Sequence, residues 1–189
     1  MLKAEVIKRG DSHDNWLPLL MQAALLAALN YVLSLSLVWL VNIKPIFVLI
    51  FMSAGVWGTG SAILTAIFGI LLWTFANPLG PAPLPVAVAQ VIGGISAAFV
   101  CSLFMLPIRS SKGTLTWLFA ALAGLISTAM FFLVVNTVDA LVNQPFWPWF
   151  VSGMLTSLLP IALHAVLFPV LVPVIARLRK LNVVGVGRS

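Results

Sequence analysis

The stretch "GVWGTGS", residues 55–61, decides the fold of this 189-residue chain, because it either interrupts or continues a long apolar segment. No charged residue occurs from residue 45 to residue 108, a length well beyond the ~20 residues of one transmembrane helix. The proline-rich stretch "NPLGPAPLP", residues 77–85, divides this segment once, since four prolines cannot continue a helix. Three glycines within six residues, at 55–60, offer a second break.

The composition sets the class of protein. Hydrophobic residues make up 62% of the chain and charged residues only 7%, whereas a soluble domain has about 25% charged residues. A water-exposed surface cannot be built from this composition, so we expect an integral membrane protein. The net charge of +6 does not indicate a nucleic-acid partner, because the basic residues lie at the chain ends and in one short loop.

The distribution of Lys and Arg decides whether the chain turns at 57–60. Without that turn there are five spans, and three basic residues face the cytoplasm while seven face outward. With it there are six spans, nine basic residues are cytoplasmic and only Lys44 is outside. The second partition agrees far better with the positive-inside rule. Six spans also place all seven tryptophans at membrane boundaries, where tryptophan concentrates, and Trp57 reaches a boundary only if the turn exists.

We therefore expect an all-α integral membrane protein with six transmembrane helices, both termini cytoplasmic, in the inner (plasma) membrane. The second helix is short, roughly 20 Å at 1.5 Å per residue, so it must be tilted, sheltered by protein or extended by the following turn. We expect a single membrane domain over 1–189, with cytoplasmic tails at 1–15 and 177–189 and helices at about 16–41, 45–57, 60–76, 85–107, 114–138 and 147–176.

Reactive side chains are scarce in the apolar segments. The acids are Glu5, Asp11, Asp14 and Asp139, so no paired carboxylates, metal-ligand pattern, catalytic triad or phosphate loop can be assembled within the membrane. We expect no enzymatic activity, no cofactor and no metal site. His164 lies within the last apolar run, one turn after Pro160, and either bonds a carbonyl freed by the proline or serves as a proton relay or metal ligand.

Polar residues gather on the expected outer side. The candidate ligand-binding residues come from the three outer connections and the helix ends beside them: Asn42, Lys44, Trp73, Asn77, Gln90, Asn136, Asp139 and Trp147. A few orienting polar groups among apolar walls are typical of a small-molecule site. The alternative is ordinary loop residues in water beside an aromatic belt.

Small residues at four-residue spacing let membrane helices approach closely. The pairs Gly93/Ala97, Gly94/Ala98 and Ala120/Gly124 favour packing inside the chain. The denser stripe in "MQAALLAALN", residues 21–30, can serve internal packing or the docking of a partner subunit. Its members are Ala23, Ala24, Ala27 and Ala28.

Over its whole length the chain resembles the substrate-binding S-components of energy-coupling-factor (ECF) transporters, in size, six helices, a short second helix and the alanine pattern of the first helix. The resemblance implies that this pattern docks onto a transmembrane coupling subunit, and that two ATPase subunits supply the energy. It also implies a vitamin-like substrate, bound on the outer side by outer loops and by the ends of helices four to six. Stacking on tryptophan and bonding to amides suit an aromatic or heterocyclic nutrient.

A second family shares part of the pattern. "IKPIFVLI", "GTGSAILTAIFGILLW" and "NPLGPAPLPVAVAQ" also resemble the rod-shape-determining MreD family, which implies a non-catalytic scaffold in a cell-envelope complex. The acidic residue expected near the end of the third helix in that family is absent here, where Trp73 and Asn77 stand instead.

Overall fold

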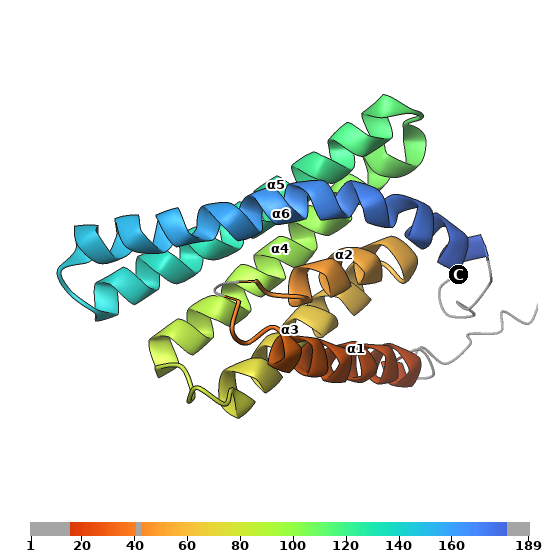
Figure 1. The fold of residues 1–189 in the computed structure, drawn as a ribbon. Helices are drawn as coiled ribbons and strands as arrows, with labels where there is room; N and C mark the ends of the chain where they lie inside the picture. Colours follow the sequence, from red (N-terminus) through yellow and green to blue (C-terminus); the bar gives the residue numbers. More distant parts are fainter. Residues whose placement is uncertain (1–15, 41–42, 181–189) are drawn as a thin grey trace, which may run out of the picture.

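A computed structural model describes residues 16–40 and 43–180, which form an all-α bundle (Figure 1). The helices are α1 (Trp16–Ser36), α2 (Ile46–Val56), α3 (Thr59–Ala76), α4 (Leu84–Ser110), α5 (Thr114–Val142) and α6 (Phe146–Lys180). All but α2 are long and apolar enough to cross a membrane. The expected all-α multi-pass membrane protein is confirmed.

The turn expected at 57–60 is present. α2 ends at Val56 with Trp57 as its C-cap, Gly58 adopts a φ of 100°, and α3 begins at Thr59. Only glycine adopts such a φ readily, so Gly58 permits the reversal that other residues would resist. The helices consequently alternate in direction (Figure 1). The start of α1, the α2–α3 and α4–α5 turns and the end of α6 lie at one end of the bundle. Residues 37–40, 43–45, 77–83 and 143–145 lie at the other, which we call the loop end.

The short helix α2 is the centre of the molecule. Nine of its eleven residues are buried, and it contacts α3, α4 and α6. At about 16 Å it cannot cross the ~30 Å hydrocarbon layer alone, and the surrounding helices shelter it from lipid. Of the three expectations for this helix, shelter by protein is the one observed.

Hydroxyl groups tie α2 to α3 inside this apolar core. Ser53 Oγ donates to Ser61 Oγ at 2.9 Å, and Thr65 Oγ1 donates to Ser53 Oγ at 3.3 Å. All three side chains are fully buried. Because an unpaired buried hydroxyl is costly, this network favours one register between the two helices.

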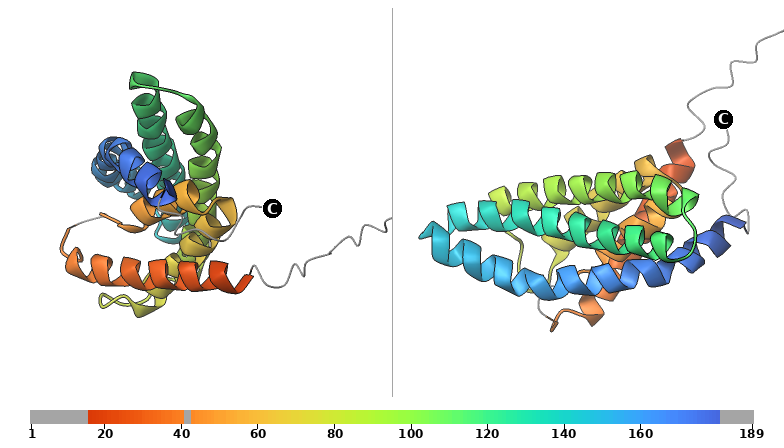
Figure 2. Two further views of the ribbon diagram at one scale, coloured as in Figure 1. Left: turned by 90° about the vertical axis from the view of Figure 1, so that its right-hand side faces the viewer. Right: turned by 90° about the horizontal axis from the view of Figure 1, so that it is seen from above.

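The helices α4, α5 and α6 lie side by side, while α1 runs obliquely along the opposite face of the bundle (Figure 2). Small residues allow the close contacts: Gly93 faces the backbone of Phe131, and Gly124 faces the backbone of His164. The internal packing predicted for Gly93/Ala97, Gly94/Ala98 and Ala120/Gly124 is confirmed, since all six residues are buried.

Several helix ends differ from the predicted positions. α1 ends at Ser36 rather than 41, because Leu40 N bonds Leu37 O at 2.8 Å and tightens the chain into turns. α5 continues past Asp139 to Val142, and α6 extends to Lys180, with its basic residues in the last turn. Charged residues near a membrane boundary do not by themselves end a helix, since water satisfies their polar groups there. Residues 1–15, most of the second predicted tail and Asn42 lie outside the described residues.

Candidate ligand-binding cavity

A cavity of about 350 Å³ lies at the loop end, between α1, α3 and the segments 37–40 and 43–45. Its volume falls at the lower end of the ~300–1,000 Å³ of small-molecule sites. The residues that line it are Asn30, Ser34, Leu37, Val38, Leu40, Ile43, Lys44, Ile46, Gly69, Ile70, Trp73, Asn77, Leu79, Gln90 and Phe131. Among the described residues, α6 contributes none of them.

Four predicted ligand-binding residues line this cavity together: Lys44, Trp73, Asn77 and Gln90. They come from four separate places in the chain: the segment 43–45, α3, the proline-rich loop and α4. The structure thus brings half of the predicted residues into one site, and it adds to them polar groups of α1.

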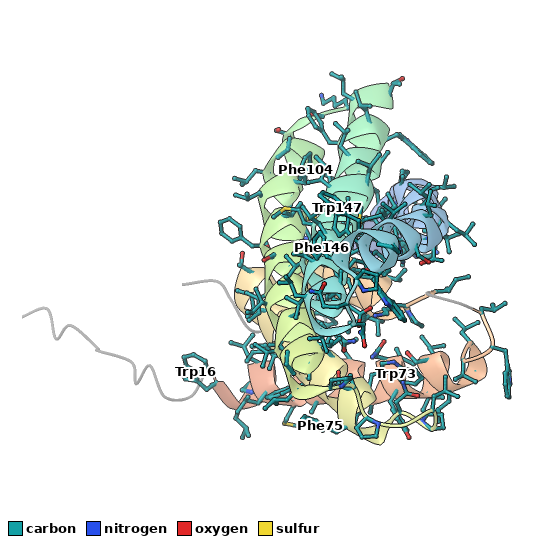
Figure 3. All side chains as sticks on the ribbon, turned by 90° about the vertical axis from the view of Figure 1, so that its left-hand side faces the viewer. Trp16, Trp73, Phe75, Phe104, Phe146 and Trp147 are labelled. Atoms are coloured by element: carbon teal, nitrogen blue, oxygen red, sulfur yellow. The ribbon has the colours of Figure 1, made fainter. Side chains whose placement is uncertain are left out.

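Three other predicted residues lie elsewhere, at the α5–α6 hairpin. Asn136 Nδ2 donates to Ser157 Oγ at 3.1 Å, so it joins α5 to α6. Asp139 Oδ1 accepts a 3.0 Å hydrogen bond from Asn143 Nδ2. Trp147 packs against Phe146, on a surface separate from Trp73 (Figure 3). None of the three lines the cavity. The α5–α6 hairpin and the 77–83 loop occupy separate places at the loop end (Figure 1).

The polar wall contributed by α1 was not predicted. Asn30 is 2% exposed, and its Nδ2 donates to the carbonyl of Gly69 on α3 at 3.1 Å. Ser34 Oγ donates to Asn30 Oδ1 at 3.4 Å. The available signal was helical spacing, since Asn30 and Ser34 continue the stripe of Ala23 and Ala27 on one face.

The proline-rich loop closes one side of the cavity. Asn77 Oδ1 accepts the amide of Leu79 at 2.9 Å, and Gly80 N donates to Asn77 O at 3.0 Å with Gly80 at a φ of 103°. The prolines lack backbone donors and restrict φ, so few hydrogen bonds are needed to hold the loop. Pro83 and Pro85 flank the start of α4, where proline is well tolerated.

Gln90 and Trp73 lie on the two helices that flank this loop, and contacts with neighbouring residues hold both in place. Thr74 Oγ1 on α3 donates to Gln90 Oε1 on α4 at 2.8 Å. Tyr31 of α1 packs beside Trp73 with ring centroids 6.2 Å apart, and its hydroxyl donates to Ala76 O at 2.9 Å. These bonds hold α1, α3 and α4 around the cavity opening.

Lys44 is the cation of the site. It is partly buried, with Nζ 4.8 Å from the ring centre of Phe131 and 5.7 Å from that of Phe132. Lys44 belongs to the connection before α2, outside the spanning helices, and burial there lowers its pKa to about 8. The ammonium group is still mostly charged at pH 7.

An aromatic layer lies beneath the cavity. Phe47 meets Phe131 edge-to-face at 5.0 Å and His164 at 5.0 Å. His164 is 1% exposed, and its Nδ1 has no hydrogen-bond partner among the described residues. Within the described chain, no group of three or more His, Cys, Asp or Glu side chains could hold a metal ion.

The predicted docking stripe of α1 is divided between two surroundings. Ala23 and Ala27 are buried on the face that packs against α3, whereas Ala24 and Ala28 are exposed. Ala24 borders an open apolar groove formed with Phe68, Leu72 and Phe75 of α3. One stripe therefore contains both internally packed and exposed alanines.

Comparisons with known proteins do not place the chain in a family. No protein-family model, curated protein or solved structure matches it.

Proposed function

We propose that this protein is the substrate-specific binding subunit of an uptake system in the plasma membrane, energised by a partner ATPase module. The observation that carries the proposal is the cavity at the loop end, where Lys44, Trp73, Asn77 and Gln90 converge. A pre-formed cavity of this size with a few polar groups suits a small nutrient, vitamin-like and carrying an aromatic or heterocyclic ring. The resemblance to ECF S-components supplies the expected coupling subunit and ATPases.

Residues of two loop-end segments line the cavity, those at 37–40 and 43–44 and those at 77–79. On the topology inferred from the basic residues, this end faces outward. Ligand capture at the outer surface followed by release inward requires an energy source, and a partner ATPase supplies it in this proposal.

Binding is tested by two alanine variants with a matched control. Asn77→Ala and Gln90→Ala each remove an amide from the cavity wall, and we expect them to weaken ligand binding about tenfold, the loss typical of one or two hydrogen bonds. Asn136→Ala removes an amide from the α5–α6 contact instead, and should leave binding unchanged. Native mass spectrometry of protein purified from its own membranes identifies the bound molecule and measures its retention.

Two results would contradict the proposal. One is an empty cavity in every preparation, together with co-purification of cell-envelope proteins rather than ATPases, which would favour the scaffold function. The other is unchanged retention of a bound molecule in both Asn77→Ala and Gln90→Ala protein, which would place the ligand elsewhere.

A further inference from the structure

The cavity holds a positive charge without a counter-charge. None of the fifteen residues that line it is acidic, and in the described part of the chain Lys44 forms no ion pair. Its neighbours are the ring faces of Phe131 and Phe132, which attract a cation but do not neutralise it. A buried charge without a partner is costly, so this site is electrostatically incomplete.

The hydrogen-bonding side chains of the cavity wall also favour an anionic ligand, because their acceptor atoms are already used. The side-chain oxygens of Asn30, Asn77 and Gln90 already accept bonds from Ser34 Oγ, Leu79 N and Thr74 Oγ1. The orientation of Asn77 is fixed chemically, because a backbone amide can only donate. Its Nδ2 therefore remains available, as does Nε2 of Gln90. Trp73 Nε1 is a donor only, and it has no partner among the described residues.

The free side-chain groups of the cavity are thus mostly donors: an ammonium, two amide NH₂ groups and an indole N–H. A neutral ligand would leave the charge of Lys44 unmatched. A phosphate ester carries a charge near −2 at pH 7, and one lysine cannot balance it. A carboxylate carries one negative charge and two acceptor oxygens, which fits one cation with neighbouring donors.

We propose that the ligand is a small organic acid, a flat ring bearing one carboxylate, and that Lys44 binds the carboxylate while the donors of Trp73, Asn77 and Gln90 orient it. This assignment rests on the proposed binding function and specifies the substrate class. The cavity volume of about 350 Å³ limits the ligand to one or two rings.

The test uses matched pairs that differ in charge but not in shape. The full chain is reconstituted in nanodiscs of phosphatidylcholine, and calorimetry measures binding of nicotinate against nicotinamide and of indole-3-acetate against indole-3-acetamide. For at least one pair we expect the carboxylate to bind about tenfold or more tightly than its amide, as for a charge-assisted hydrogen bond. Lys44→Met should remove this preference and Lys44→Arg should preserve it.

Equal affinity within each pair, no binding of any carboxylate, or a preference that survives Lys44→Met would overturn the assignment. So would competition by the lipid, seen as a more than tenfold loss of carboxylate affinity in nanodiscs containing phosphatidylglycerol. Native mass spectrometry separates these failures from failure of the proposed function. A neutral molecule retained in the cavity would refute only the proposal that the ligand is an organic acid. A cavity that is always empty would refute both that proposal and the proposed binding function.

Discussion

Gly124 provides the sharpest test of the packing between α5 and α6. A Cβ at this position would lie 2.6 Å from the carbonyl carbon of His164, 3.0 Å from the amide nitrogen of Ala165, and closest to the His164 carbonyl oxygen. Ordinary contact begins near 3.4 Å, so the α6 backbone must retreat by at least 0.8 Å to accept alanine. No side-chain rotation can relieve a collision with backbone atoms, and overpacking of this kind costs about 1–3 kcal/mol.

Gly60→Ala is the matched control for Gly124→Ala. A Cβ at Gly60 meets no atom within 4 Å, and Gly60 is the second residue of α3. The helix-forming benefit of alanine is about 0.5–1 kcal/mol in a helix interior, where Gly124 lies, and is smaller in the first turn, where Gly60 lies. A lower stability of Gly124→Ala than of Gly60→Ala therefore reflects the collision. We expect Gly124→Ala to unfold several degrees below Gly60→Ala, since 1 kcal/mol corresponds to about 2–4 °C for a chain of this length.

The assay is thermal unfolding of the purified protein in detergent, followed by tryptophan fluorescence and by the fraction that remains monodisperse after heating. Equal transition temperatures for the two variants would refute the inferred backbone contact, because the collision follows directly from it. A higher transition temperature for Gly124→Ala would show that α5 and α6 are further apart than described.

The remaining predictions concern the cavity, the core and the α1 surface. The pKa of Lys44 is about 8, and an anionic ligand binds its charged form. Carboxylate binding, measured by calorimetric titration, should therefore weaken about tenfold from pH 7 to pH 9. Lys44→Arg should abolish this pH dependence, because arginine stays charged. Ser53→Ala removes the partner of the buried Ser61 hydroxyl and should lower the free energy of unfolding by about 1–3 kcal/mol. The same melting assay measures this loss, and an unchanged transition temperature would exclude the hydroxyl network as a stabilising element. Ala24→Leu or Ala28→Leu should block co-purification of a coupling subunit but spare ligand binding, and normal association of both variants would exclude α1 as the docking surface.

The number and direction of the helices could be predicted because they depend on local composition. The hydrophobicity of each apolar stretch indicates that it enters the membrane, and the positions of the basic residues indicate which helix ends lie on the same side of the membrane. Gly58 with its neighbouring glycines gave the turn that makes α2 a separate helix. Helix ends were less certain, because Asp139 and Arg177 each lie within a helix that continues past them.

The candidate site was predictable only in part. The distribution of charged and polar residues assigned all eight predicted residues to the outer side of the membrane. In the structure, however, the loop end carries two separate surfaces. Lys44, Trp73, Asn77 and Gln90 meet around the cavity, while Asn136, Asp139 and Trp147 lie at the α5–α6 hairpin. Asn30 was overlooked because its importance depends on α1 packing against Gly69 of α3.

The sequence by itself determined that the chain is a helical membrane protein, that it turns at Gly58, and that polar groups gather at one end. Those features follow from the free energy of transferring each short segment between water and lipid, which depends on that segment alone. Only the tertiary structure decided that α2 is sheltered at the centre, that α1 completes the cavity, and that Lys44 has no acidic partner among the described residues. Such features depend on which side chains of distant segments come into contact, and that is set by the packing of the helices against one another.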